Sequence, residues 1–92
     1  MTADRPPVTA DRPHLPRRPL WLCRVCAAPW PCVVARETLL AEYGDNRGGL
    51  SVHLCTALFN ATRDLHALNP DGTPSPRDLY ARFIGWAPRM PL

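Results

Sequence analysis

Three cysteines in the segment 23–32 constrain the fold more than any other feature of the chain. Cys23 and Cys26 form a C-x-x-C pair, and Cys32 follows after five further residues. Two thiolates separated by two residues can bind one metal ion from a single tight turn. Cys32 precedes a predicted helix, where backbone N–H groups and the helix dipole favour a thiolate. The window therefore predicts a metal-binding knuckle.

The size of the chain supports a metal site. With 92 residues there is room for one small domain, whose hydrophobic core is marginal and often needs a metal or a disulfide. Residues 1–6 carry no apolar signal region, and no stretch reaches the length of a membrane span. We therefore expect a cytoplasmic protein with reduced thiols, which favours a metal over disulfides. In a secreted protein, two disulfides with three possible connectivities would be the alternative.

The chain divides into a tail, a domain and a short closing tail. Residues 1–19 contain five prolines and the repeat Thr-Ala-Asp-Arg-Pro at 2–6 and 9–13, which predicts a disordered or extended tail. Its end, residues 14–19, is expected to lie along the domain. We assign residues 20–87 to a knuckle followed by helices, and 88–92 to the closing tail.

Three helices are predicted, and no strand pattern of useful length is present. The first spans roughly 33–43 and ends before Gly44, and the second spans roughly 49–68. The third begins with Ser75 as N-cap and Pro76 at the first helical position, and its apolar face includes Trp86. The main apolar stripe of the second helix consists of Leu50, Leu54, Ala57, Leu58, Ala61, Leu65 and Leu68. The fold class is mainly α, a small three-helix domain with an N-terminal metal-binding knuckle.

A second apolar stripe lies on the other side of the long helix. It contains Val52, Cys55 and Phe59. A helix that is apolar on two sides is usually sandwiched between other elements or contributes to an oligomer interface. A dimer is therefore an expected possibility for this chain.

Zinc is the metal that this residue pattern favours. Structural zinc sites take four tetrahedral ligands from cysteine and histidine, so three cysteines need one more. His14 is the preferred fourth ligand of Cys23, Cys26 and Cys32, because it lies nine residues before Cys23 on an arm that can fold back. Cys55 and then His53 are the alternatives. An iron–sulfur cluster is the alternative cofactor.

Other features carry less functional information. We expect Trp21, Trp30 and Trp86 to belong mainly to the core, with Trp30 the most exposed of the three because it stands between two prolines. All 11 basic residues are arginine and the net charge is only +3, so nucleic-acid binding is weakly supported. The candidate anion-binding strip comprises Arg12, Arg17, Arg18, Arg24 and Arg36. No convincing general acid, base or nucleophile can be assigned, so no catalytic residue is predicted.

The cysteine window resembles short uncharacterised actinobacterial proteins with a W-x-C-x-x-C-x-x-P-W-P-C-x-x-A-R core. Here that core runs from Trp21 to Arg36, and the similarity extends to Gly85-Trp86. Such proteins are often labelled flavin reductase, which would imply a flavin-linked redox accessory protein. A flavin reductase of the familiar kind needs a β-barrel, and this sequence predicts none.

Cys23-x-x-Cys26-x5-Cys32 followed by a helix is also similar to the core of the WhiB-like iron–sulfur regulators. That resemblance would imply a cluster held by four cysteines. The family places its fourth cysteine well upstream, and no cysteine precedes Cys23 here.

Together these features favour a small zinc-binding helical protein that acts as an interaction or regulatory module and is not an enzyme. The alternatives are the flavin-linked accessory protein and the iron–sulfur regulator. The expected partner is another protein or a second copy of the chain, and no membrane partner is expected.

Overall fold

The computed structural model describes residues 13–88, which form three helices and one minimal hairpin. The elements in chain order are β1 (Pro16–Arg17), β2 (Leu22–Cys23), α2 (Val33–Tyr43), α3 (Arg47–Leu68) and α4 (Pro76–Phe83). The predicted fold class is thereby confirmed. The predictions made for 1–12 and 89–92 lie outside the described residues.

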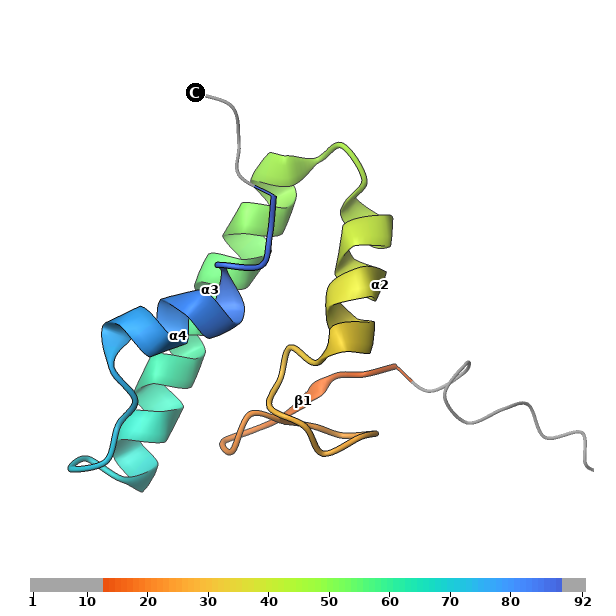
Figure 1. Cartoon of the computed structure of the whole chain (residues 1–92). Coiled ribbons are helices and arrows are strands. Elements are labelled where there is room, and N and C mark those ends of the chain that lie inside the picture. The colour runs from red at the N-terminus through yellow and green to blue at the C-terminus, as the bar shows by residue number, and fades with distance from the viewer. Residues whose placement is uncertain (1–12, 89–92) are drawn as a thin grey trace, which may run out of the picture.

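The helices are arranged around α3, which packs against both α2 and α4. In Figure 1, α2 and α3 stand side by side and are joined at one end, and α4 crosses α3. Residues 13–32, which we call the knuckle segment, lie at the other end of α2. The knuckle segment therefore lies where the α2–α3 pair opens, away from their connecting turn.

The ends of the first two helices follow from their capping residues. Gly44 has a positive φ of 51° and donates its backbone N–H to Leu40 O, as expected for a residue that ends a helix. The next helix begins at Arg47, two residues before its predicted start, because the Asn46 side chain accepts a hydrogen bond from Gly49 N and acts as the N-cap.

The third helix starts as predicted and ends early. The Ser75 hydroxyl accepts a hydrogen bond from Asp78 N, and Pro76 occupies the first helical position. The helix ends at Phe83, so Trp86 lies in the turns that follow. The predicted apolar face of this helix therefore holds Leu79 and Phe83, both buried, but not Trp86.

The core confirms most of the main stripe of α3 and corrects the expectations for Leu68 and Trp30. Leu50, Leu54, Ala57 and Ala61 are buried and Leu58 and Leu65 are partly buried, whereas Leu68, at the end of the helix, is 50% exposed. The Trp30 side chain, expected to be the most exposed tryptophan, is only 3% exposed, whereas Trp86 is partly buried. The prolines that flank Trp30 do not lift it out of the core, because its ring packs against Trp21 and Phe83.

Three aromatic rings join the knuckle segment to α4. Trp21 and Phe83 meet edge to face with ring centroids 5.5 Å apart, and Trp30 lies 5.9 Å from Trp21 and 6.1 Å from Phe83. Tilted and edge-to-face contacts at these distances are favourable arrangements for aromatic pairs. The cluster therefore fixes the knuckle segment against the end of α4.

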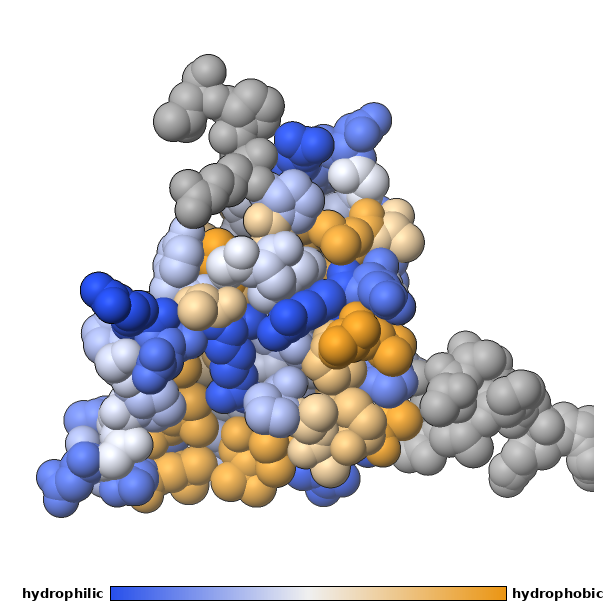
Figure 2. All heavy atoms as spheres, in the orientation of Figure 1, coloured by the Kyte–Doolittle hydropathy of each residue, from blue (hydrophilic) through white to orange (hydrophobic). Residues whose placement is uncertain are grey.

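Several large hydrophobic side chains remain on the surface. Figure 2 shows orange side chains gathered along the lower edge, where Figure 1 places the knuckle segment and the end of α3. Leu20 and Leu68, from these two regions, are each 50% exposed. None of the described helices combines the length and the apolar character that crossing a membrane requires.

Candidate metal centre

The hairpin brings His14 back to the cysteines. Pro16 pairs with Cys23 in the antiparallel β1–β2 register, and Arg24 N donates to Leu15 O at 2.9 Å. Trp30 Nε1 then donates to His14 O at 2.8 Å. These contacts fix the backbone of His14 and of the two residues that follow it. The arm therefore lies along the domain, as the sequence analysis expected.

A tight turn places Cys26 next to Cys23. Cys23 N donates to Ala28 O at 2.7 Å, and Ala27 N donates back to Cys23 O at 3.0 Å. Ala27 adopts a left-handed conformation with φ 63°, which reverses the chain directly after Cys26. The C-x-x-C pair is thus held by backbone hydrogen bonds within the turn.

Cys32 reaches the site because it is the N-cap of α2. Its Sγ accepts a hydrogen bond from Ala35 N at 3.5 Å, in the way that a serine or aspartate oxygen caps a helix. The thiol therefore points at the unpaired N–H groups of the first helical turn, where the helix dipole favours negative charge. Cys32 therefore lies at the start of a helix, as predicted, but its thiol pKa is not lowered there, because burial raises it.

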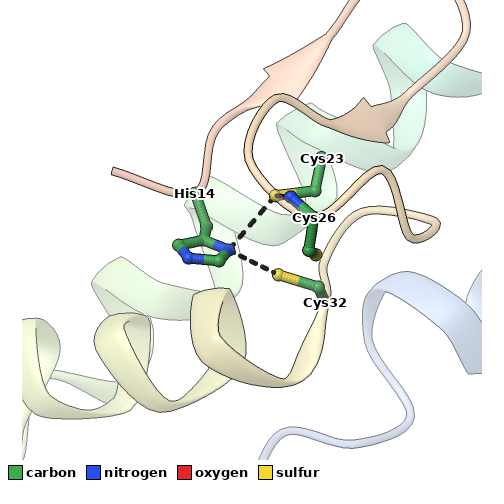
Figure 3. Close-up of side chains that lie close together, drawn as sticks. All are labelled: His14, Cys23, Cys26 and Cys32. Carbon is green, nitrogen blue, oxygen red and sulfur yellow. Dashed lines mark hydrogen bonds between the residues drawn. The ribbon is translucent and has the colours of Figure 1, made fainter. Parts of the chain in front are cut away.

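Four side chains meet in one site, which Figure 3 shows from close range. One ligand atom from each of His14, Cys23, Cys26 and Cys32 lies within 4.8 Å of all the others. His14 Nδ1 is 3.2 Å from Cys23 Sγ and 3.3 Å from Cys32 Sγ. The structure thus brings together the same four residues that the sequence analysis named as ligands, in a group that could hold a metal ion.

The site is mostly enclosed. Cys23 and Cys32 are buried, His14 is partly buried and Cys26 is exposed. Trp30, which belongs to the aromatic cluster, also contacts the His14 backbone. An ion held here would reach the solvent mainly on the Cys26 side.

The alternative fourth ligands lie elsewhere. Cys55 is exposed on α3 and is not part of the group, and the exposed His53 lies next to Tyr43, with 3.2 Å between Nδ1 and the hydroxyl. The third histidine, His66, is exposed and its Nδ1 is 3.1 Å from Thr73 Oγ1.

The electrostatics of the site differ between its two buried thiols. Burial raises the pKa of the Cys23 thiol, but hydrogen bonds from the backbone N–H groups of Cys26 and Val25, together with those from the Cys26 and Cys32 side chains, outweigh burial and lower this pKa to about 6. Burial also raises the pKa of Cys32, and there the Ala35 N–H does not compensate for it. The Cys23 environment thus favours the thiolate, the form in which cysteine binds metals.

One buried nitrogen of the site has no hydrogen-bond partner within residues 13–88. His14 Nε2 is buried and makes no hydrogen bond to the described residues. Leaving a buried ring nitrogen unpaired is unfavourable, and histidine ligands usually donate this second N–H to an acceptor. The favourable contacts of the imidazole therefore come from the Nδ1 side, which faces the three sulfurs.

Two polar residues that support the site were not identified from the sequence. Arg82 of α4 donates from Nε to Trp30 O at 2.8 Å and from a terminal nitrogen to Trp21 O at 2.6 Å. Asp64 of α3 accepts from Trp21 Nε1 at 2.8 Å and from Arg18 Nε at 2.7 Å. Their partners lie 43 to 61 residues away in sequence, so no local pattern could indicate these contacts.

The arginines of the candidate anion-binding strip do not act as one group. Arg18 pairs with Asp64, and Arg36 donates to Pro31 O at 3.0 Å. Arg17 and Arg24 are exposed on the hairpin, and Arg12 lies outside the described residues.

The chain has no match among known proteins in three kinds of comparison. No family model, no curated protein and no solved structure matches it. Its function therefore has to be argued from the site itself.

Proposed function

We propose that the protein is a small zinc-binding module whose metal fixes the arm around His14 and the C-x-x-C turn onto the helices. The observation that carries this proposal is the convergence of one nitrogen and three sulfur ligand atoms within 4.8 Å. A tetrahedral zinc ion with Zn–S of about 2.3 Å and Zn–N of about 2.0 Å places its ligand atoms roughly 3.5–3.8 Å apart. The spacing of the group supports a single ion of this size.

The ligand set supports zinc over the iron–sulfur alternative. Three cysteines with one histidine is a common structural zinc set, whereas clusters are held mostly by four thiolates. A cluster also attaches its ligands to different iron atoms, so they lie farther apart than the ligands of one ion. The near contacts of His14 Nδ1 with Cys23 Sγ and Cys32 Sγ support one shared ion.

A structural role follows from the number of protein ligands. Four side chains complete a tetrahedral zinc ion and leave no position for a water molecule or substrate. We therefore propose an interaction or regulatory module in the cytoplasm and not an enzyme. Metal binding supplies folding free energy, because the ligands come from separate parts of a small domain.

The first experiment measures the metal content of the full chain, purified under reducing conditions without added metal. We expect about one zinc per chain by inductively coupled plasma mass spectrometry, and a large fall in the melting temperature when a strong chelator is added. The proposal is contradicted if the protein contains no metal, or if its circular dichroism and melting curve do not change when the chelator is added.

The same preparation separates the alternatives. A brown protein with absorbance near 400 nm under anaerobic conditions would replace zinc by an iron–sulfur cluster. Colourless, metal-free protein that oxidises NAD(P)H in the presence of FMN or FAD would favour the flavin-linked redox role.

A further inference from the structure

The metal centre places one exposed sulfur beside two buried ones. Cys26 is exposed, whereas Cys23 and Cys32 are buried, and the ligand atoms of all three lie within 4.8 Å of one another. A cysteine that responds to oxidants needs a sulfur that the oxidant can reach and a second sulfur close enough to bond with it. The group therefore has the features of an oxidisable thiol pair as well as those of a metal centre.

We propose that the C-x-x-C pair is a redox switch of the zinc site, in which a peroxide oxidises Cys26, Cys26 forms a disulfide with Cys23, and the loss of both ligands releases the ion. This inference rests on the zinc site proposed above and adds its regulation. The disulfide removes two of the four ligands of the group. His14 and Cys32 alone cannot complete a tetrahedral zinc site, so the bound ion is lost.

The reaction consists of two displacements. The Cys26 thiolate attacks one oxygen of hydrogen peroxide, so that an S–O bond forms, the O–O bond breaks, hydroxide leaves and Cys26 becomes a sulfenic acid. The Cys23 thiolate then attacks the Cys26 sulfur, so that the S–S bond forms, the S–O bond breaks and a second hydroxide leaves. Two protons from the solvent convert both hydroxides to water. The two sulfurs lose two electrons in total and the peroxide oxygens gain them.

The backbone favours Cys23 over Cys32 as the partner of Cys26. Cys23 and Cys26 share one turn, which is closed by backbone hydrogen bonds of 2.7 Å from the N–H and 3.0 Å to the carbonyl oxygen of Cys23. Cys26 N lies 3.5 Å from Cys23 Sγ, so the buried sulfur already faces the exposed cysteine. Cys32 belongs to another segment, where its Sγ accepts from Ala35 N and caps α2. C-x-x-C is also the spacing at which disulfide oxidoreductases form their disulfide.

Oxidation should loosen the arm around His14 more than the helices. With Cys23 in a disulfide, one of the two sulfurs that lie 3.2 and 3.3 Å from His14 Nδ1 is no longer a thiolate. The arm then depends on the hydrogen bond from Trp30 Nε1 to His14 O and on a hairpin of two-residue strands. The packing of α3 against α2 and α4 does not involve this arm. The switch thus changes the surface that the module offers to a partner.

The test uses the full-length chain, whose zinc content is measured before any oxidant is added. The reductant is removed under anaerobic conditions, hydrogen peroxide is added in excess, and a chromogenic chelator records the zinc that is released. We expect release of about one zinc per chain, together with a disulfide between Cys23 and Cys26. A thiol reductant and added zinc should restore the starting protein, because a disulfide is reversible.

Peptide mass spectrometry identifies the residues that react. Trypsin cleaves after Arg24, so a disulfide from Cys23 to Cys26 joins two peptides, whereas one from Cys26 to Cys32 lies within a single peptide. A 1,3-dione that traps sulfenic acids should label Cys26 and prevent the disulfide. Cys55→Ser is the control, because it removes the other exposed cysteine, which lies outside the group, and it should release zinc at the native rate.

The outcomes separate the switch from the zinc site itself. Zinc-loaded protein that keeps its ion in peroxide overturns the switch and leaves the proposed zinc site unaffected. Release that depends on Cys55, that links Cys26 to Cys32, or that leaves Cys26 as a sulfinic acid which thiols do not reduce also contradicts the switch. Protein that holds no zinc before peroxide is added overturns the zinc site and the switch together.

Discussion

The knuckle segment and the helical part of the molecule are stabilised in different ways. The helices bury a repeating set of small and branched apolar side chains on α3, such as Leu54 and Ala61. The knuckle segment contains only two strands of two residues each, and single directional contacts such as Trp30 Nε1 to His14 O hold its loops. Apolar packing tolerates substitutions of similar volume, whereas a ligand atom or a directed hydrogen bond does not.

This difference predicts how strongly a single substitution destabilises each region. Loss of one apolar contact should lower the free energy of unfolding of the helical part by an amount that follows the volume removed. Loss of one metal ligand should remove most of the stabilisation of the knuckle segment at once, because the remaining ligands cannot complete the site. The following variants test this contrast.

The largest effect is expected for Cys32→Ser, with Cys55→Ser as its control. Serine is a good N-cap, so the substitution keeps the hydrogen bond to Ala35 N and removes only the thiolate. We expect loss of the metal and a destabilisation on the order of 5 kcal/mol or more. The exposed Cys55 should be replaceable without change in metal content. Stoichiometric zinc in Cys32→Ser, measured together with its melting curve, would exclude Cys32 as a ligand.

A smaller effect of a different kind is expected in the helices. Leu54 has no exposed area at the centre of α3, so Leu54→Ala should lower the free energy of unfolding by about 3 kcal/mol through lost burial and a residual cavity. The protein should still bind one metal ion. Leu68→Ala, at the half-exposed end of the helix, is the control and should cost much less. If Leu54→Ala also released the metal, the knuckle segment and the helices would not be stabilised independently.

Arg82 tests the connection between the two regions. Arg82→Met keeps the aliphatic packing but removes the side-chain donors to Trp30 O and Trp21 O, of which Trp21 O still accepts from Trp30 N; the loss should cost about 2 kcal/mol. Arg77→Met, an exposed position on the same helix, is the control. We expect the indole NMR signals of Trp21 and Trp30 to shift only in Arg82→Met. Equal melting curves for the two variants would mean that these contacts do not stabilise the knuckle segment.

The sequence predicted local features well. The N-cap at Ser75, the helix end at Gly44 and the main stripe of α3 up to Leu65 each follow from a few neighbouring residues, and the structure confirms them. The grouping of His14 with the cysteines was also foreseen, because nine residues of an extended arm can return to Cys23.

The features that were missed depend on distant parts of the chain. Trp30 was expected to be exposed, yet it is buried because Phe83 and Arg82 of α4 meet it from far along the sequence. The role of Asp64 likewise depends on a tryptophan and an arginine more than forty residues away. Helical periodicity shows which face of a helix is buried, but it does not show which polar groups on other elements will form hydrogen bonds to a loop.

Asp64 predicts a dependence on pH. Its hydrogen bond with Arg18 lowers the carboxyl pKa; burial opposes this shift, and Trp21 Nε1 adds to it. Because the folded pKa is below the unfolded one, the stabilisation is complete above the unfolded value and is lost as the pH falls through the folded value. Asp64→Asn should cost about 1 kcal/mol at neutral pH. This difference should shrink in acid, measured by urea unfolding wherever both proteins still hold their metal. A constant difference down to pH 3 would contradict this assignment.

The smallest expected effect is that of an alanine-to-glycine substitution, which should raise the free energy of unfolding in the knuckle segment and lower it in α2. Ala27 has φ 63° and an exposed side chain in the turn after Cys26, so Ala27→Gly removes the left-handed strain without losing packing. Strain of roughly 1–2 kcal/mol, less the greater freedom of glycine in the unfolded chain, leaves a gain of about 0.5 kcal/mol. The exposed Ala41 lies in α2, where the same substitution should cost about 0.5–1 kcal/mol. Chemical unfolding of the two variants measures both changes. If both variants are destabilised equally, Ala27 is not strained by its left-handed conformation.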